Sequence, residues 1–193
     1  MKKKTNLFIL PFILMGMLLM LTSSCKKDEA ADVPATVSDK IFYEQLGVTI
    51  IKCYTDIYNQ NLAGKPTGIQ NITSNGPMGG TVVITGSDSY DDTHGITTTN
   101  LDLAMTNVQY TYSKSSESGN TTATTQVTLT GATTYDGSFS NTYTSVNHQS
   151  QNLHIKGSVT YAGTIRNIDM TGQVSINRSS TTSVTIFGNT VSW

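Results

Sequence analysis

The sequence predicts an α+β fold that is mainly β: a curved antiparallel sheet or partial barrel with one N-terminal amphipathic helix packed on it. Apolar residues between positions 38 and 62 recur with the period of a helix, whereas beyond Pro66 they alternate with polar residues in short segments. Clusters of Gly, Asn, Asp and Ser separate these segments. With 193 residues, the chain is long enough for one domain of ordinary size.

The composition indicates a polar surface that carries few charges. Charged residues make up 13% of the chain, against roughly 25% in a typical soluble domain, while Thr, Ser and Asn occur 32, 20 and 14 times. The formal net charge is -1, so the chain has no basic surface of the kind that binds nucleic acid. We therefore expect no nucleic-acid partner.

The N-terminus has the features of a secretory signal peptide. Lys2, Lys3 and Lys4 precede an apolar run over residues 7–21, and small residues at 22–24 precede Cys25. As a helix this run would be about 22 Å long, which is shorter than the ~30 Å hydrocarbon core of a bilayer. We therefore expect residues 1–24 to be a cleaved signal rather than a permanent membrane span.

The residues around Cys25 resemble the lipobox of bacterial lipoproteins, in which the cysteine at the cleavage site receives a diacylglycerol. Leu21 stands four positions before the cysteine, whereas the family usually has its aliphatic residue three positions before, where this chain has Thr22. The charged residues 26–29, Lys-Lys-Asp-Glu, resemble the export signal of Bacteroidetes-type surface lipoproteins. The resemblance implies lipid attachment, including palmitate, at Cys25. It also implies anchoring in the outer membrane, at the cell surface or on its inner side.

The alternative is that Cys25 is an ordinary thiol, free to form a disulfide with Cys53, the only other cysteine. Lipidation removes that option and leaves Cys53 to be buried as a small apolar group. Residues 25–37 then form a lipidated tether, because their second half has little to bury. Residues 38–193 remain for a single domain of one helix and an antiparallel sheet.

The domain is predicted to begin with a helix from Ser38 to Leu62. Ser38 is a suitable N-cap, and Gly64 followed by Pro66 is a suitable end. One broad apolar face is expected to pack onto the sheet. Spacings of 4, 4, 3 and 4 place five residues on that face: Phe42, Leu46, Ile50, Cys53 and Ile57.

The rest of the domain is predicted to be strand. Candidate strands cover residues 81–85, 96–112, 122–130, 138–146, 153–161, 164–170, 173–177 and 182–187, with 191–193 as a possible ninth. Apolar residues change parity between Met105 and Val108, so a bulge near Thr106 and Asn107 is needed to keep them on one face. Residues 165–170 show the same change. Thr fills most of the opposite positions, as in a sheet with one solvated face.

An internal similarity links two of these segments. The pattern Val-x-Ile-Thr-Gly-x-x-x-Tyr-Asp at 82–91 recurs at 127–136 with Leu in place of Ile. Two copies are fewer than the three or more that a repeat array needs. They fit a duplicated hairpin within one sheet and a coincidence of composition equally well.

Chemistry-bearing patterns are scarce, and we predict that the protein is not an enzyme and uses no cofactor. H-E-x-x-H, G-x-S-x-G, C-x-x-C and P-loop spacings are all missing from the sequence. Asp88, Asp91, Asp92 and His94 crowd one predicted turn and are candidate Ca²⁺ ligands. A solvated turn in which Asp side chains bond their own backbone explains them more simply, so no metal is predicted.

Two histidines and six tyrosines are the other candidates for a site. His154 is expected to point to solvent from a strand, and His148 to lie in the polar turn before it. The tyrosine rings could stack on sugars, but packing within the sheet is the expected role. The six are Tyr90, Tyr110, Tyr112, Tyr135, Tyr143 and Tyr161.

These features together predict a lipid-anchored outer-membrane or cell-surface protein with a non-catalytic binding or structural role. Its membrane contact is the N-terminal lipid, and its partner is expected to be a glycan or another envelope protein. The alternative is a carrier of lipids or lipoproteins, similar in architecture to the localisation-of-lipoprotein family. There a half-open barrel holds acyl chains and helices plug it.

Overall fold

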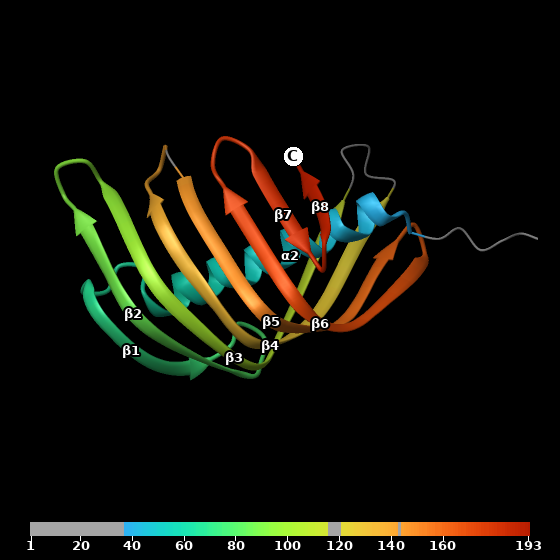
Figure 1. Cartoon of the computed structure of the whole chain (residues 1–193), viewed down its shortest axis with the longest axis horizontal. Coiled ribbons are helices and arrows are strands. Elements are labelled where there is room, and N and C mark those ends of the chain that lie inside the picture. The colour runs from blue at the N-terminus through green and yellow to red at the C-terminus, as the bar shows by residue number, and fades with distance from the viewer. Residues whose placement is uncertain (1–36, 116–120, 143) are drawn as a thin grey trace, which may run out of the picture. The chain divides into compact units, whose positions relative to one another are not determined.

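The computed structural model describes residues 37–115, 121–142 and 144–193 (Figure 1). They belong to one compact unit, Thr36–Trp193. The predictions for Cys25, for the signal peptide at 1–24, for nearly all of the tether and for Tyr143 lie outside the described residues.

The predicted fold class is confirmed: the described chain is mainly β, with a single curved antiparallel sheet that is not closed and one helix packed on it. The helix α2 spans Asp39–Asn61. The strands are β1 (Gly68–Asn75), β2 (Thr81–Asp91), β3 (Ile96–Ser115), β4 (Thr122–Phe139), β5 (Thr144–Tyr161), β6 (Thr164–Arg178), β7 (Thr182–Ile186) and β8 (Asn189–Ser192). Their order in the sheet is their order in the sequence, so every neighbouring pair is a hairpin.

The sheet curves around α2, which crosses its strands (Figure 1). The predicted apolar face of the helix is confirmed, because Phe42 is 2% exposed and Leu46, Ile50, Cys53 and Ile57 are fully buried. They pack against the inward side chains of the strands in one continuous core. Burial of each large side chain contributes about 1.5 to 3 kcal/mol, so this helix is a major source of stability.

Both ends of α2 follow the predicted signals. At the start, the Ser38 hydroxyl accepts a hydrogen bond from the Ile41 amide. Arg166 of β6 also donates to the Asp39 carboxylate at 2.6 Å and lies over the Phe42 ring at 4.1 Å. At the other end, Gly64 has a φ of +70°, the left-handed conformation that commonly follows a helix. The start of the helix is therefore held against β6.

Two bulges keep the apolar side chains on the inner face of the sheet. The predicted bulge in β3 is confirmed, because the register with β4 shifts between Met105 and Val108. A second shift lies in β5, between Ser150 and Leu153. Each adds one residue and so restores the inward direction of the next apolar side chain.

Several strand predictions are wrong. The first strand, β1, was not predicted, because its two isoleucines lie on opposite faces and give no alternation of apolar and polar residues. Ile69 points outward and is 92% exposed. Residues 138–146 do not form one strand, because β4 ends at Phe139 and β5 begins at Thr144. Residues 164–178 are one strand, and no bulge lies at 165–170. Ile165 is simply on the outer face, 62% exposed.

The two copies of the internal similarity lie on β2 and β4, with β3 between them. Their first apolar positions correspond, since Val82 and Val127 both point into the core. Their tyrosines do not: Tyr135 is buried, whereas Tyr90 is 53% exposed. Beyond the shared glycine, the two segments therefore have different surroundings.

Candidate functional site

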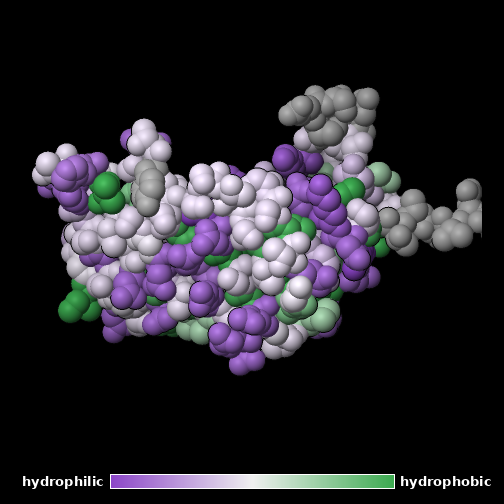
Figure 2. All heavy atoms as spheres, turned by 45° about the horizontal axis from the view of Figure 1, so that its top comes forward, coloured by the Kyte–Doolittle hydropathy of each residue, from purple (hydrophilic) through white to green (hydrophobic). Residues whose placement is uncertain are grey.

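The outer face of the sheet, which is the face turned away from α2, is built mainly of hydroxyl and amide side chains. On β4 these outward residues alternate with buried ones along the strand. They are Thr122, Thr124, Gln126, Thr128, Thr130, Ala132, Thr134, Asp136 and Ser138. Figure 2 shows polar and intermediate residues over most of one side of the molecule, with hydrophobic ones in small separate spots. The outer face therefore offers many hydrogen-bonding groups and little charge.

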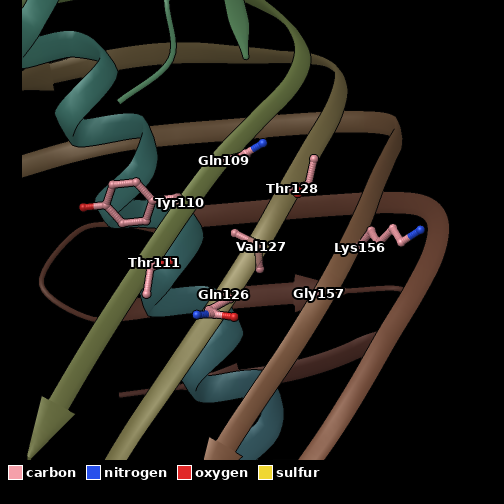
Figure 3. A pocket seen from close by; sticks show the side chains of 8 residues that line it. All are labelled: Gln109, Tyr110, Thr111, Gln126, Val127, Thr128, Lys156 and Gly157. Carbon is pink, nitrogen blue, oxygen red and sulfur yellow. The ribbon is translucent and has the colours of Figure 1, made fainter. Parts of the chain in front are cut away.

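A shallow hollow of 380 Å³ lies on this face where β3, β4 and β5 run side by side (Figure 3). Its floor includes the backbone of Tyr110 and Val127, whose side chains are buried on the inner side. In Figure 3 the Tyr110 ring points towards the helix, where its hydroxyl donates to the Asp56 carboxylate. The polar residues that line the hollow are Gln109, Thr111, Gln126, Thr128 and Lys156.

Gly157 brings β4 and β5 close together beneath this hollow. A Cβ atom at this position would lie 1.9 Å from the Gln126 carbonyl oxygen, so no other residue fits without a shift of the backbone. The antiparallel register of β4 and β5 places the Gln126 and Lys156 side chains at the same hollow.

A second hollow of 260 Å³ lies further along β4, next to the bulge of β5. Ala132 and Thr134 of β4 line it together with Gln149, Gln151 and Asn152 of β5. Between the two hollows, Thr130 accepts a hydrogen bond from the Asn107 amide of the β3 bulge. The bulges thus divide the outer face of β4 into two polar depressions.

Three charged or titratable side chains on β5 and β6 form a cluster on the outer face. His154 lies 2.8 Å from a carboxylate oxygen of Asp169, and Lys156 lies 3.7 Å from the other. The hydrogen bond from His154 lowers the pKa of Asp169. The prediction that His154 faces outward is confirmed, with its side chain 40% exposed.

The predicted turn position of His148 is wrong, because His148 lies within β5 and is 1% exposed. Its ring packs between those of Tyr54 and Tyr135, at centroid distances of 4.8 and 4.5 Å. Burial lowers the pKa of His148 to about 3, so the ring is neutral at pH 7. The β5 bulge separates it from His154, which faces outward.

Most of the strand tyrosines pack in the sheet, as expected. Tyr110 and Tyr135 are buried, and Tyr112 and Tyr161 are partly buried against the core. Tyr90 is the exception, because more than half of its surface is exposed.

Three of the four candidate metal ligands near the β2–β3 turn have other partners: Asp88, Asp91 and His94. Asp88 is buried and accepts hydrogen bonds from the Gly68 amide and the Gln70 side chain. Asp91 accepts from the Thr93 amide and lies 2.6 Å from the His94 ring. Among residues 37–193, as far as they are described, no three His, Cys, Asp or Glu side chains are grouped as metal ligands.

Cys53 is a free thiol on the buried face of α2, and burial raises its pKa to about 12. The thiol is therefore protonated at neutral pH, as expected of a cysteine that fills space in a core.

The concave side of the sheet is filled by α2. Leu46, Ile50 and Ile57 are fully buried between the helix and the strands. An acyl chain could occupy this space only if the helix moved out of it.

A further cavity of 450 Å³ lies at the C-terminal end of α2, and we call it the helix-end cavity. Its lining includes Tyr58 of the helix, the C-cap residue Leu62, Lys65 and Thr67 of the following loop, and Tyr90 of β2. Sequence reasoning missed this cavity, because its walls come from segments far apart in the chain. It also missed the outer-face hollows, for which alternating Thr and Gln was the only signal.

No protein-family model, curated protein or solved structure matches this chain. Within the described part of the chain, no helix is both long and apolar enough to cross a membrane. No role can therefore be transferred from a relative to any residue of the domain.

Proposed function

We propose that the protein is a lipid-anchored, non-catalytic binding or structural protein of the outer membrane, displayed at the cell surface. The observation that carries this proposal is Cys25, which directly follows a short apolar segment and small residues. Two or three acyl chains on one cysteine hold a protein firmly, whereas a single chain binds only marginally.

Chain length supports a domain that stands away from the lipid. The compact unit begins at Thr36, eleven residues after Cys25. Such a segment reaches at most about 40 Å when extended. A connection of this length is long enough for the domain to stand clear of the lipid.

The outer face is the surface that we propose for contact with a glycan or an envelope protein. Its amides and hydroxyls can both donate and accept hydrogen bonds. Because few ionised side chains lie on this face, an uncharged partner that covers it takes few charges out of water.

Membrane fractionation of the wild type, Cys25→Ala and Cys53→Ala tests the anchor. We expect Cys25→Ala to leave the membrane fraction, while Cys53→Ala, which changes the buried thiol, stays in it. A Cys25→Ala protein that remains with the membrane would overturn the proposal. Protease treatment of intact cells then distinguishes the faces: digestion of the domain supports surface display, and protection assigns it to the periplasmic side.

Site-specific photo-crosslinking in intact cells tests the contact surface. A photoreactive residue at Gln126, on the outer face, is compared with one at Lys52, which is exposed on α2. We expect adducts from position 126 and none from position 52. The reverse pattern, or no adduct from either position, would contradict a contact role for the outer face.

The lipid-carrier alternative makes a different prediction. Because α2 fills the concave side, we expect no extractable lipid in the Cys25→Ala protein purified without detergent. Mass spectrometry that finds one or more acyl lipids per chain would favour the carrier instead.

A further inference from the structure

The helix-end cavity combines an exposed aromatic ring with fixed polar walls. Tyr90 belongs to the inward-facing positions of β2, where Val82 and Ile84 are fully buried, yet Tyr90 itself is 53% exposed. An inward aromatic ring without cover leaves one apolar face open to a ligand. Its hydroxyl lies near Gly95 in the β2–β3 turn.

The second ring in the cavity, Tyr58, is held rigidly. It makes edge-to-face contacts with Tyr135 at 5.7 Å and with Phe139 at 5.2 Å, and it is 8% exposed. Burial raises the pKa of the Tyr58 hydroxyl, and nearby Asp88 raises it further, so this hydroxyl stays protonated. It can therefore donate a hydrogen bond as well as accept one.

The walls of the cavity are fixed by hydrogen bonds of the chain itself. The Lys65 amide donates to the Leu62 carbonyl at 3.0 Å, which shapes the turn after α2. Asp88 binds the Gly68 amide and the Gln70 side chain, which holds the start of β1 beside the cavity. A preformed cavity of 450 Å³ is within the usual range for small-ligand sites.

The charges near the C-terminal end of α2 determine which class of ligand the cavity favours. The C-terminal end of a helix carries partial negative charge, which disfavours an anion and favours groups that donate hydrogen bonds. Lys65 is the one charged side chain in the lining, and its amine already donates to the Gln60 carbonyl. The Thr67 hydroxyl can donate or accept, whereas the Thr97 hydroxyl bonds to that of Tyr58 and can still accept. The lining therefore suits a neutral molecule that has one apolar face and several hydroxyl groups.

We propose that the helix-end cavity binds one pyranose ring of an uncharged glycan. The C–H face of the sugar stacks on Tyr90, and its hydroxyls bond with Tyr58, Thr67 and Thr97. This inference rests on the proposed binding role and names a ligand class for it, but it uses a different surface from the outer face. It does not depend on lipidation of Cys25.

An array of neutral oligosaccharides, probed with the full-length chain in a detergent that lacks a sugar head group, tests this proposal. We compare the wild type with Tyr90→Ala, Tyr90→Phe and the outer-face control Gln126→Ala. Binding should become about tenfold weaker with Tyr90→Ala and remain with Tyr90→Phe and Gln126→Ala. Because Tyr90 is exposed, thermal unfolding should show that Tyr90→Ala stays folded.

The other outcomes separate this inference from the proposed function. Loss of sugar binding only in Gln126→Ala would overturn the cavity as the site and support the outer face. No binding to any neutral sugar by the wild type would overturn the cavity proposal, while fractionation and crosslinking would still decide the anchor and the protein partner.

Discussion

Along β4, residues that face α2 alternate one by one with residues that face outward, and the two sets differ in almost every property. Val127 and Leu129 point inward and are buried, whereas Gln126 and Thr128 point outward at the hollow between strands. The inner set packs against the helix and determines the fold. The outer set makes few contacts that the fold requires, so its chemistry is free to serve recognition.

A matched pair of substitutions on neighbouring residues should produce the largest difference between the faces. Leu129→Ala removes a fully buried side chain and should lower the free energy of unfolding by about 2 to 5 kcal/mol. Thr128→Ala, on the outer face, should change it by about 0.5 kcal/mol or less. Urea unfolding of both proteins measures this. Equal losses would show that the outer face is also needed for the fold.

A smaller effect is expected where the backbone, rather than a side chain, sets the curvature. Gly86 has a φ of +118°, and a Cβ there would lie 2.2 Å from the Asn100 carbonyl oxygen. Gly86→Ala should therefore cost about 2 to 3 kcal/mol in unfolding free energy. Gly64→Ala is the control, because Gly64 also has positive φ but has open space around it, and it should cost about 1 kcal/mol. A similar cost for both would mean that β2 and β3 can separate without penalty.

The smallest effect is a dependence on pH that arises in the inner face. Burial lowers the pKa of His148 to about 3, below its ordinary 6.5, so the unfolded chain binds more protons between these values. Stability should be highest above pH 6.5 and fall as the pH decreases, by about 2 kcal/mol between pH 7 and pH 5.

His148→Phe keeps a ring between Tyr54 and Tyr135 but removes the titrating group. Its unfolding free energy should depend less on pH over this range. If the wild type and His148→Phe lose the same stability between pH 7 and pH 5, then His148 is not the source of the effect.

The inner face could be predicted from the sequence because buried apolar residues recur with the period of the helix or strand that carries them. The spacing of Leu46, Ile50 and Ile57 indicated the helix face, and the parity change from Met105 to Val108 indicated the β3 bulge. Strand β1 escaped prediction because only Ile72 of its two isoleucines packs against the core. His148 was misplaced because the polar residues around it resemble a turn, although its neighbours across the sheet bury it.

The candidate sites could not be predicted because no local pattern defines them. Gln109, Gln126 and Lys156 meet only through the register of three strands. Tyr58 and Tyr90 come together only because α2 ends beside the β2–β3 hairpin. Threonine and glutamine at alternate positions fit any solvated strand, so they indicate a face but not a hollow.

The anchor at Cys25 decides whether these surfaces meet partners at the membrane, and mass spectrometry of the N-terminal peptide from membrane-extracted protein tests it most directly. We predict that the peptide begins at Cys25 and carries the mass of a diacylglycerol, with or without a further acyl chain. A peptide that begins elsewhere, or one with an unmodified cysteine, would contradict the proposed function.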